Sequence, residues 1–64
     1  SFVDLFEYVF RLNEMQMINE VVWKRWKVFI ETIMTIPKFR IIWDKTKELR
    51  PDKGFEEFID SNTS

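Results

Sequence analysis

The last part of the chain holds the acidic residues best placed for acid–base chemistry. Glu56, Glu57 and Asp60 lie close together in a stretch that we expect to be helical, and Glu56 and Asp60 would share one helix face. Paired carboxylates act as general acid and base only where a cleft brings a second pair to face them. A chain of 64 residues has little room for such a cleft. We therefore predict a solvated helix face here.

The other residue types that enzymes use are scarce. The chain contains no His and no Cys, so the commonest general base, the best soft nucleophile, ordinary zinc ligands and disulfides are all excluded. Gly54 is the single glycine, so no glycine-rich loop can hold a phosphate group. We predict that the chain is not an enzyme and has no cofactor or metal site.

Aromatic and basic residues alternate in the segment Trp23-Lys24-Arg25-Trp26-Lys27, a composition that can bind nucleic acid by stacking and phosphate contact. Helical spacing places the two tryptophans on the apolar arc and Lys24 and Lys27 opposite them, so the aromatic and basic groups would not share a surface. The sequence pI of about 5.3 also disfavours nucleic acid. We interpret these tryptophans as core residues.

The net charge of −1 conceals an acid–base–acid pattern. Residues 1–20 hold four acids and one base, residues 21–50 eight bases and three acids, and residues 51–64 four acids and one base. The segments can neutralise one another when helices pack, or the basic middle can face an anionic partner, either lipid headgroups or nucleic acid. The candidate contacts for such a partner are Lys38, Arg40, Lys45, Lys47 and Arg50.

The clearest helical period runs from Val21 to Met34. At about 100° per residue its apolar residues fall on one side and most of its charged residues on the other. Asn19 is a good N-cap for this helix. We expect it to be the central helix of the fold. Its predicted buried stripe consists of Val22, Trp23, Trp26, Phe29, Ile30, Ile33 and Met34.

Three more helices are expected, over residues 2–12, 37–50 and about 53–60. Ser1 and Asp4 suit a capping box, Pro37 suits a first helical turn, and Asp52 can cap the last helix. The buried stripe of the third helix would be Phe39, Ile42, Trp43, Thr46 and Leu49, and that of the fourth Phe55, Phe58 and Ile59. The fold class is therefore all-α, three amphipathic helices plus a short C-terminal helix in a small helical bundle.

The junctions between elements are less sharply marked. Asn13 could end the first helix in a left-handed conformation, but residues 13–18 contain no Gly or Pro. A single long rod that fuses the first two helices is therefore the alternative. We expect residues 61–64 to form a frayed polar tail.

Apolar residues cover well over half of the first helix, and Asp4, Glu7 and Arg11 are left for water. Such a helix needs cover on more than one side, from flanking helices, a second chain or an upstream segment. We expect residues 1–64 to form one helical domain, a fragment of a longer chain because it begins with Ser1, that works as a protein-interaction or structural module and self-associates or binds the missing upstream segment. The candidate interface residues are Phe2, Val3, Phe6, Phe10, Val21, Val28 and Ile41.

The aromatic positions also carry a resemblance that covers nearly the whole chain: Phe6-Glu7, Ile18-Asn19-Glu20, Trp23, Trp26, Pro37, Phe39, Ile42-Trp43, Phe55, Phe58 and Ile59. This pattern resembles the C-terminal helical region of small uncharacterised bacterial proteins, a domain of unknown function that follows one N-terminal transmembrane helix. Met17 departs from it, since the pattern usually has Gly there. The resemblance implies a membrane-tethered helical domain, with membrane contact only through that unseen anchor, and transfers no catalytic residue. The lack of cysteine is compatible with the cytoplasmic side.

Overall fold

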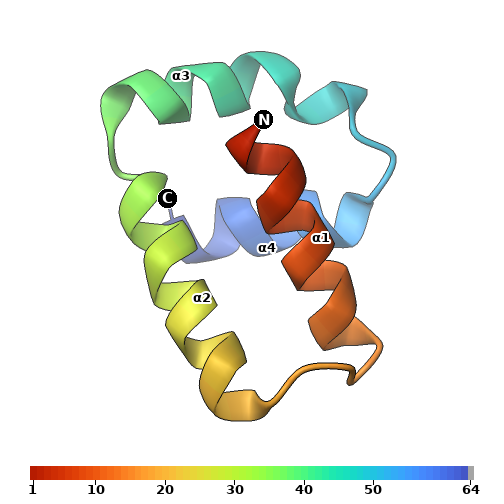
Figure 1. Cartoon of the computed structure of the whole chain (residues 1–64). Coiled ribbons are helices and arrows are strands. Elements are labelled where there is room, and N and C mark those ends of the chain that lie inside the picture. Colours follow the sequence, from red (N-terminus) through yellow and green to blue (C-terminus); the bar gives the residue numbers. More distant parts are fainter. Residues whose placement is uncertain (64) are drawn as a thin grey trace. The chain divides into compact units, whose positions relative to one another are not determined.

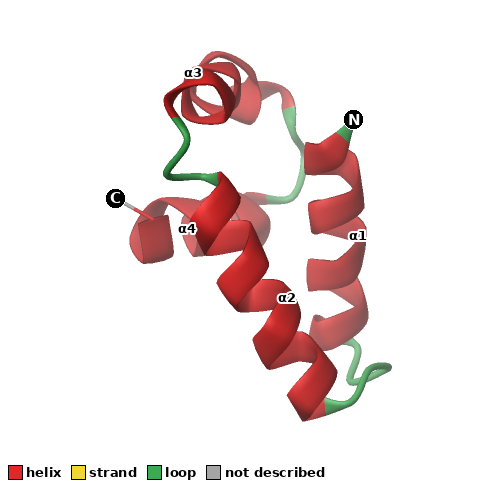
Figure 2. Cartoon of the chain, turned by 60° about the vertical axis from the view of Figure 1, so that its left-hand side comes forward, coloured by secondary structure: helices red, strands yellow, loops and turns green. Residues whose placement is uncertain are grey.

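The computed structural model describes residues 1–63, and this range contains helices and no strand (Figure 1, Figure 2). The elements are α1 (Phe2–Glu14), α2 (Glu20–Ile33), α3 (Pro37–Thr46), the 3₁₀ turn η1 (Lys47–Leu49) and α4 (Lys53–Thr63). The predicted all-α class, with three helices and a C-terminal fourth, is confirmed. The chain divides into two compact units, an N-terminal unit Ser1–Ile30 and a C-terminal unit Glu31–Ser64.

Helix α1 begins with the predicted capping box. The Asp4 amide donates to the Ser1 hydroxyl, and the Asp4 carboxylate accepts from the Ser1 amino group, so both nitrogens at the helix start have a partner. Because Asp4 also places a negative charge in the first turn, the helix dipole is complemented there.

The link between α1 and α2 rules out the single long rod, because residues 15–19 are not helical. The left-handed residue is Gln16, with φ of 57°, and not Asn13 as predicted. The Met17 amide donates to the Leu12 carbonyl and the Gln16 amide to the Asn13 carbonyl, both at 2.9 Å. These are the two bonds of a Schellman motif, so the first helix is closed by backbone geometry in the absence of glycine.

Helices α1 and α2 contact each other through aromatic edges. Phe6 meets Phe29 with ring centroids 5.9 Å apart, and Phe10 meets Trp23 at 6.3 Å. The earlier residue of α1 pairs with the later residue of α2, so the two helices run antiparallel, as Figure 1 shows. At the start of α2, Asn19 accepts a hydrogen bond from the Val21 amide at 2.7 Å, which confirms the predicted N-cap.

Glu7 differs from its predicted exposure to water. It is buried, with a relative exposure of 9%, and its carboxylate accepts a 3.0 Å hydrogen bond from Arg11 one turn later. On the helical wheel Glu7 lies beside the arc of Val3 and Phe10, so burial of those side chains covers it too. The ion pair with Arg11 supplies the partner that a buried carboxylate requires.

In the C-terminal unit, Pro37 begins α3 after the extended residue Ile36, as predicted. The helix is shorter than expected: it ends at Thr46 and tightens into η1 before Arg50 extends toward Pro51. Trp43 is fully buried against the edge of Phe55 from α4, with centroids 5.5 Å apart. This pair is the centre of the unit's apolar core.

Helix α4 is capped by Asp52, whose carboxylate accepts from the Phe55 amide at 3.1 Å, as predicted. It continues to Thr63, so the prediction of a frayed tail is wrong for residues 61–63, while Ser64 lies outside the described residues. Ser61 and Asn62 donate to the carbonyls of Glu57 and Phe58, one turn earlier, at 2.6 and 2.8 Å. These side-chain bonds hold the polar end against the helix.

Candidate interaction surfaces

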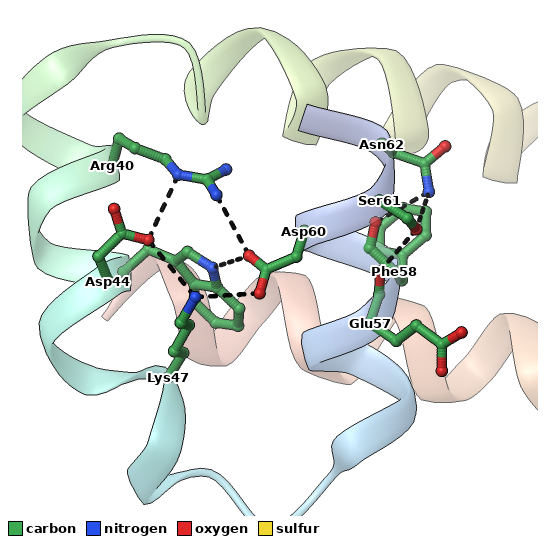
Figure 3. Close-up of polar contacts among 9 residues, drawn as sticks. Arg40, Asp44, Lys47, Glu57, Phe58, Asp60, Ser61 and Asn62 are labelled. Atoms are coloured by element: carbon green, nitrogen blue, oxygen red, sulfur yellow. Dashed lines mark hydrogen bonds and ion pairs between the residues drawn. The ribbon is translucent and has the colours of Figure 1, made fainter. Parts of the chain in front are cut away.

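A cluster of charged groups surrounds Asp60 in the C-terminal unit (Figure 3). One carboxylate oxygen accepts from the Trp43 indole at 2.9 Å and from Arg40 at 3.2 Å, and the other accepts from Lys47 at 3.1 Å. Asp44 lies on the same side, 3.5 Å from Arg40 and 3.8 Å from Lys47. The cluster therefore ties the end of α4 to α3 and η1.

Helical spacing explains how α3 and η1 present these groups together. Arg40, Trp43, Asp44 and Lys47 follow one another at i, i+3, i+4 and i+7, which places them on one face. Trp43 is buried as predicted. Arg40 and Lys47 were instead predicted to face an anionic partner, and Asp60 to lie on a solvated helix face. The prediction failed because Asp60 is 13 to 20 residues away from its donors, which no local pattern reveals.

The environment shifts the pKa of both partners. Desolvation by burial acts to raise the Asp60 pKa, but hydrogen bonds from Trp43 and Lys47, with the charges of Lys47 and Arg40, hold it below its ordinary value. The hydrogen bond to Asp60 raises the pKa of Lys47 above its ordinary value. Both groups are charged at neutral pH, and the carboxylate already accepts hydrogen bonds from three side chains. The cluster is therefore suited to holding helices together and not to proton transfer.

The five cations predicted to face an anionic partner do not lie on one surface. Arg40 and Lys47 point into the Asp60 cluster, with side chains only 24% and 26% exposed. Lys38 and Lys45 lie on the opposite side of α3, exposed and without an ion pair in residues 1–63. Arg50 is half-buried in the link to α4. The structure thus leaves two of the five cations on one exposed face.

The apolar candidates on α1 divide into two groups. Val3, Phe6 and Phe10 are buried, so they do not lie on an exposed interface as predicted. Phe2 is 62% exposed, and Leu5 and Tyr8 continue from it at i+3 and i+6 with 45% and 61% exposure. We name Phe2, Leu5 and Tyr8 the α1 face. Leu5 and Tyr8 were missed, although the excess of apolar residues around this helix was the signal for them.

No charged residue falls within the arc of the α1 face on a helical wheel. Val9 falls in the same arc but is buried. Leu12, one turn after Tyr8, is half-buried and extends the arc toward the turn. An exposed apolar face that is free of charge over about two helical turns, from Phe2 to Tyr8, is typical of a protein contact.

Helix α2 and α3 each expose apolar residues beside cations. Val21 and Val28 are 59% and 63% exposed, and they flank Lys24 and Arg25. The predicted core positions Val22 and Phe29 are also exposed, at 42% and 48%.

On α3, the predicted interface residue Ile41 is 54% exposed. Ile42 and Leu49, which the predicted stripe had placed in the core, are also exposed, at 45% and 82%. The buried face of α3 is instead the one centred on Trp43, and the tighter winding of η1 turns Leu49 outward.

Arg25 also corrects the prediction for the Trp-Lys-Arg-Trp-Lys segment. Arg25 lines a hollow together with Trp26 and Phe29, so aromatic and basic groups do share a surface at this point. Trp26 is only half-buried and meets Phe29 edge to face at 6.0 Å. Trp23, which meets Phe10 edge to face, is half-buried as well, so neither tryptophan is the fully buried core residue expected.

The chain matches no known protein-family model, no curated protein and no solved structure. The resemblance to a membrane-anchored bacterial domain of unknown function therefore stays a prediction. Within the part of the chain that the structure describes, no helix has the length and apolar character needed to cross a bilayer.

Proposed function

We propose that this chain is a non-catalytic protein-interaction module that associates with a second copy of itself through the α1 face. The observation that supports this proposal is the second apolar side of α1, where Phe2, Leu5 and Tyr8 stay exposed while Phe6 and Phe10 are buried. One helix thus carries two apolar sides, and on the second of them Phe2, Leu5 and Tyr8 stay exposed in the described chain.

A second copy fits this face better than it fits the other exposed apolar residues. In a two-fold dimer each residue meets its own surface patch, so the patch must be complementary to itself. The α1 face has no charge and can meet its copy without repulsion. The exposed faces of α2 and α3 carry Lys24 and Arg25, or Lys38 and Lys45, and would bring like charges together.

Aromatic anchors make the contact energetically useful. Burying an exposed apolar side chain of this size contributes about 1.5–3 kcal/mol, and Phe and Tyr lose little conformational entropy because they have few rotatable bonds. Part of this gain offsets the lost freedom of two molecules. The Tyr8 hydroxyl gives the rim of the contact a polar group that can stay in water.

The test is the mass of the chain in solution, measured by light scattering over a dilution series. We expect twice the monomer mass of 7.9 kDa for the wild type and the monomer mass for Tyr8→Glu and Phe2→Glu. Phe2→Glu adds an acid to the first turn, where the helix dipole favours it, so the fold should survive. Circular dichroism checks this.

Leu49→Glu is the matched control, because Leu49 is an equally apolar side chain at 82% exposure on the C-terminal unit. It should dimerise as the wild type does. A wild-type monomer at all concentrations, or dimers that persist in both α1 variants, would refute the proposal. A monomeric Leu49→Glu variant would place the interface on the C-terminal unit instead.

A further inference from the structure

The outer face of α2 has a pattern distinct from that of α1. Val21, Lys24, Arg25 and Val28 follow one another at i, i+3, i+4 and i+7, and they line an open hollow of about 430 Å³. A second hollow of about 240 Å³ is lined by Arg25, Trp26 and Phe29. Arg25 therefore lies between two apolar hollows on one helix.

The guanidinium of Arg25 is not neutralised by an acid within the described chain. In residues 1–63 it has no ion pair, whereas most other arginines there are held by acids or lie half-buried. Lys24 does pair with Glu20, at 3.5 Å, but both side chains are more than 70% exposed and such a pair is weak. No acid lies among residues 21–30, so the face is positive as well as apolar.

The shape of the hollows restricts what can bind. Both are shallow and open to solvent, and a small molecule would stay largely exposed in them, unlike a ligand in an enclosed pocket. A side chain presented by a partner helix can fill each hollow while the partner's backbone stays outside. The guanidinium between them offers two parallel N–H groups, which match a carboxylate.

We propose that this face of α2 binds an acidic amphipathic helix of another protein. The partner places an apolar side chain in each hollow, and a Glu or Asp between those two side chains pairs with Arg25. Such a partner helix carries apolar side chains at i and i+7 and acids at i+3 and i+4, all on one face.

Charge placement separates this partner from the alternatives. On a membrane-bound helix the cations flank the apolar face, but here Lys24 and Arg25 lie between Val21 and Val28 and would have to enter the bilayer. A second copy would set Arg25 against Arg25. Nucleic acid would leave both valines without apolar contact, and the sequence pI of about 5.3 disfavours binding to a polyanion. An acidic helix satisfies the apolar and the basic groups together.

The experiment measures fluorescence anisotropy of a labelled, alanine-based helical peptide of about fifteen residues that carries this leucine and glutamate pattern. A second peptide has Gln in place of each Glu. We expect the full 64-residue chain to bind the Glu peptide at least about tenfold more tightly than the Gln peptide. Arg25→Gln should remove most of that preference, and Arg25→Glu should abolish binding.

Lys45→Gln is the matched control, since Lys45 is an exposed cation of α3, outside the face, and has no ion pair in residues 1–63. It should bind the Glu peptide within about twofold of the wild type. Equal affinity for the two peptides, no binding of the Glu peptide, or an unchanged Arg25→Gln variant would overturn the proposal. So would binding to phosphatidylcholine vesicles with about a quarter phosphatidylserine that Arg25→Gln abolishes, because a membrane would then be the partner.

The proposal is independent of self-association. The Phe2→Glu variant lacks the α1 contact but keeps the α2 face, and it should bind the Glu peptide as the wild type does. If the chain proves monomeric, peptide binding is still expected. A Phe2→Glu variant that loses the peptide would show that this face requires the dimer, and the α2 face alone would then not be the binding site.

Discussion

The two units join their helices with different kinds of side chain. In the N-terminal unit the contacts between α1 and α2 are edges of aromatic rings, Phe6 on Phe29 and Phe10 on Trp23. In the C-terminal unit Trp43 makes an aromatic contact with Phe55 and also donates to Asp60. The second arrangement fixes the orientation of the buried Trp43 ring, since a hydrogen bond needs its donor within a narrow range of angles.

This difference has a physical consequence for how each unit responds to change. Aromatic contacts are broad, so a side chain of similar volume can replace one partner at small cost. Asp60 accepts from three different side chains, and a shift or rotation of α4 would leave several of these groups unsatisfied. We therefore expect the C-terminal unit to hold its helices in a more closely specified register.

The largest expected effect comes from substituting the central aromatic of each unit conservatively. Phe6→Leu nearly keeps the volume of a fully buried side chain and should lower the free energy of unfolding by less than about 1.5 kcal/mol. Trp43→Phe leaves a cavity and removes a donor from Asp60, which should cost about 2–4 kcal/mol. Urea denaturation followed by circular dichroism measures both. Equal losses would mean that the indole hydrogen bond adds nothing to packing.

The charge of Asp60 should have the next largest effect. Asp60→Asn keeps an acceptor for Trp43 but removes the attraction to Arg40 and Lys47. Because its side chain is 33% exposed, solvent screens part of this attraction, and we expect a loss of roughly 1 kcal/mol at neutral pH. Asp44→Asn is the matched control, at 52% exposure on the edge of the cluster, and should cost less.

The difference in the free energy of unfolding between the wild type and Asp60→Asn should also depend on pH. The pKa of Asp60 is lowered from 3.8, so its stabilisation is complete above pH 3.8 and is lost as pH falls through the lower pKa of the folded state. The pKa of Lys47 is raised from 10.5, so its stabilisation is complete below pH 10.5 and is lost as pH rises through the higher folded pKa. The stability gap between the wild type and Asp60→Asn should be widest between these limits and narrow beyond both. A gap that is constant with pH would contradict the ion pairs.

Much of the local structure could be predicted because its causes lie within one turn. The caps at Ser1, Asn19 and Asp52 each depend on a side chain two or three residues from the amide it accepts from. The start of α3 follows from Pro37 alone. These features need no knowledge of what the helix packs against.

The faces of the helices were predicted less well, because they depend on contacts between distant segments. On α3 the wheel correctly placed Trp43 in the core, where it contacts Phe55 and Asp60 of α4. The same wheel also placed Ile42 and Leu49 there, and both are exposed. On α1 the wheel showed too many apolar residues but did not show which side the chain would cover, so Phe6 and Phe10 were grouped with Phe2. Only the covered side distinguishes them.

The smallest expected effect tests the turn of the N-terminal unit. Gln16 adopts the left-handed conformation at the end of α1, which costs a residue with a Cβ atom about 1–2 kcal/mol. Glycine avoids this cost but loses roughly 0.5–1 kcal/mol through its greater freedom in the unfolded chain. Gln16→Gly should therefore raise the free energy of unfolding by about half to one kcal/mol, measured by urea denaturation.

Gln16→Ala separates the backbone effect from any contact of the side chain. Alanine keeps the Cβ atom and its steric cost, so this variant should match the wild type, while Gln16→Gly exceeds it. If both variants were less stable than the wild type, the Gln16 side chain would be the stabilising group, and the turn would owe its shape to that contact. A gain confined to glycine would show instead that the N-terminal unit tolerates a strained turn because the backbone bonds from Gln16 and Met17 hold it closed.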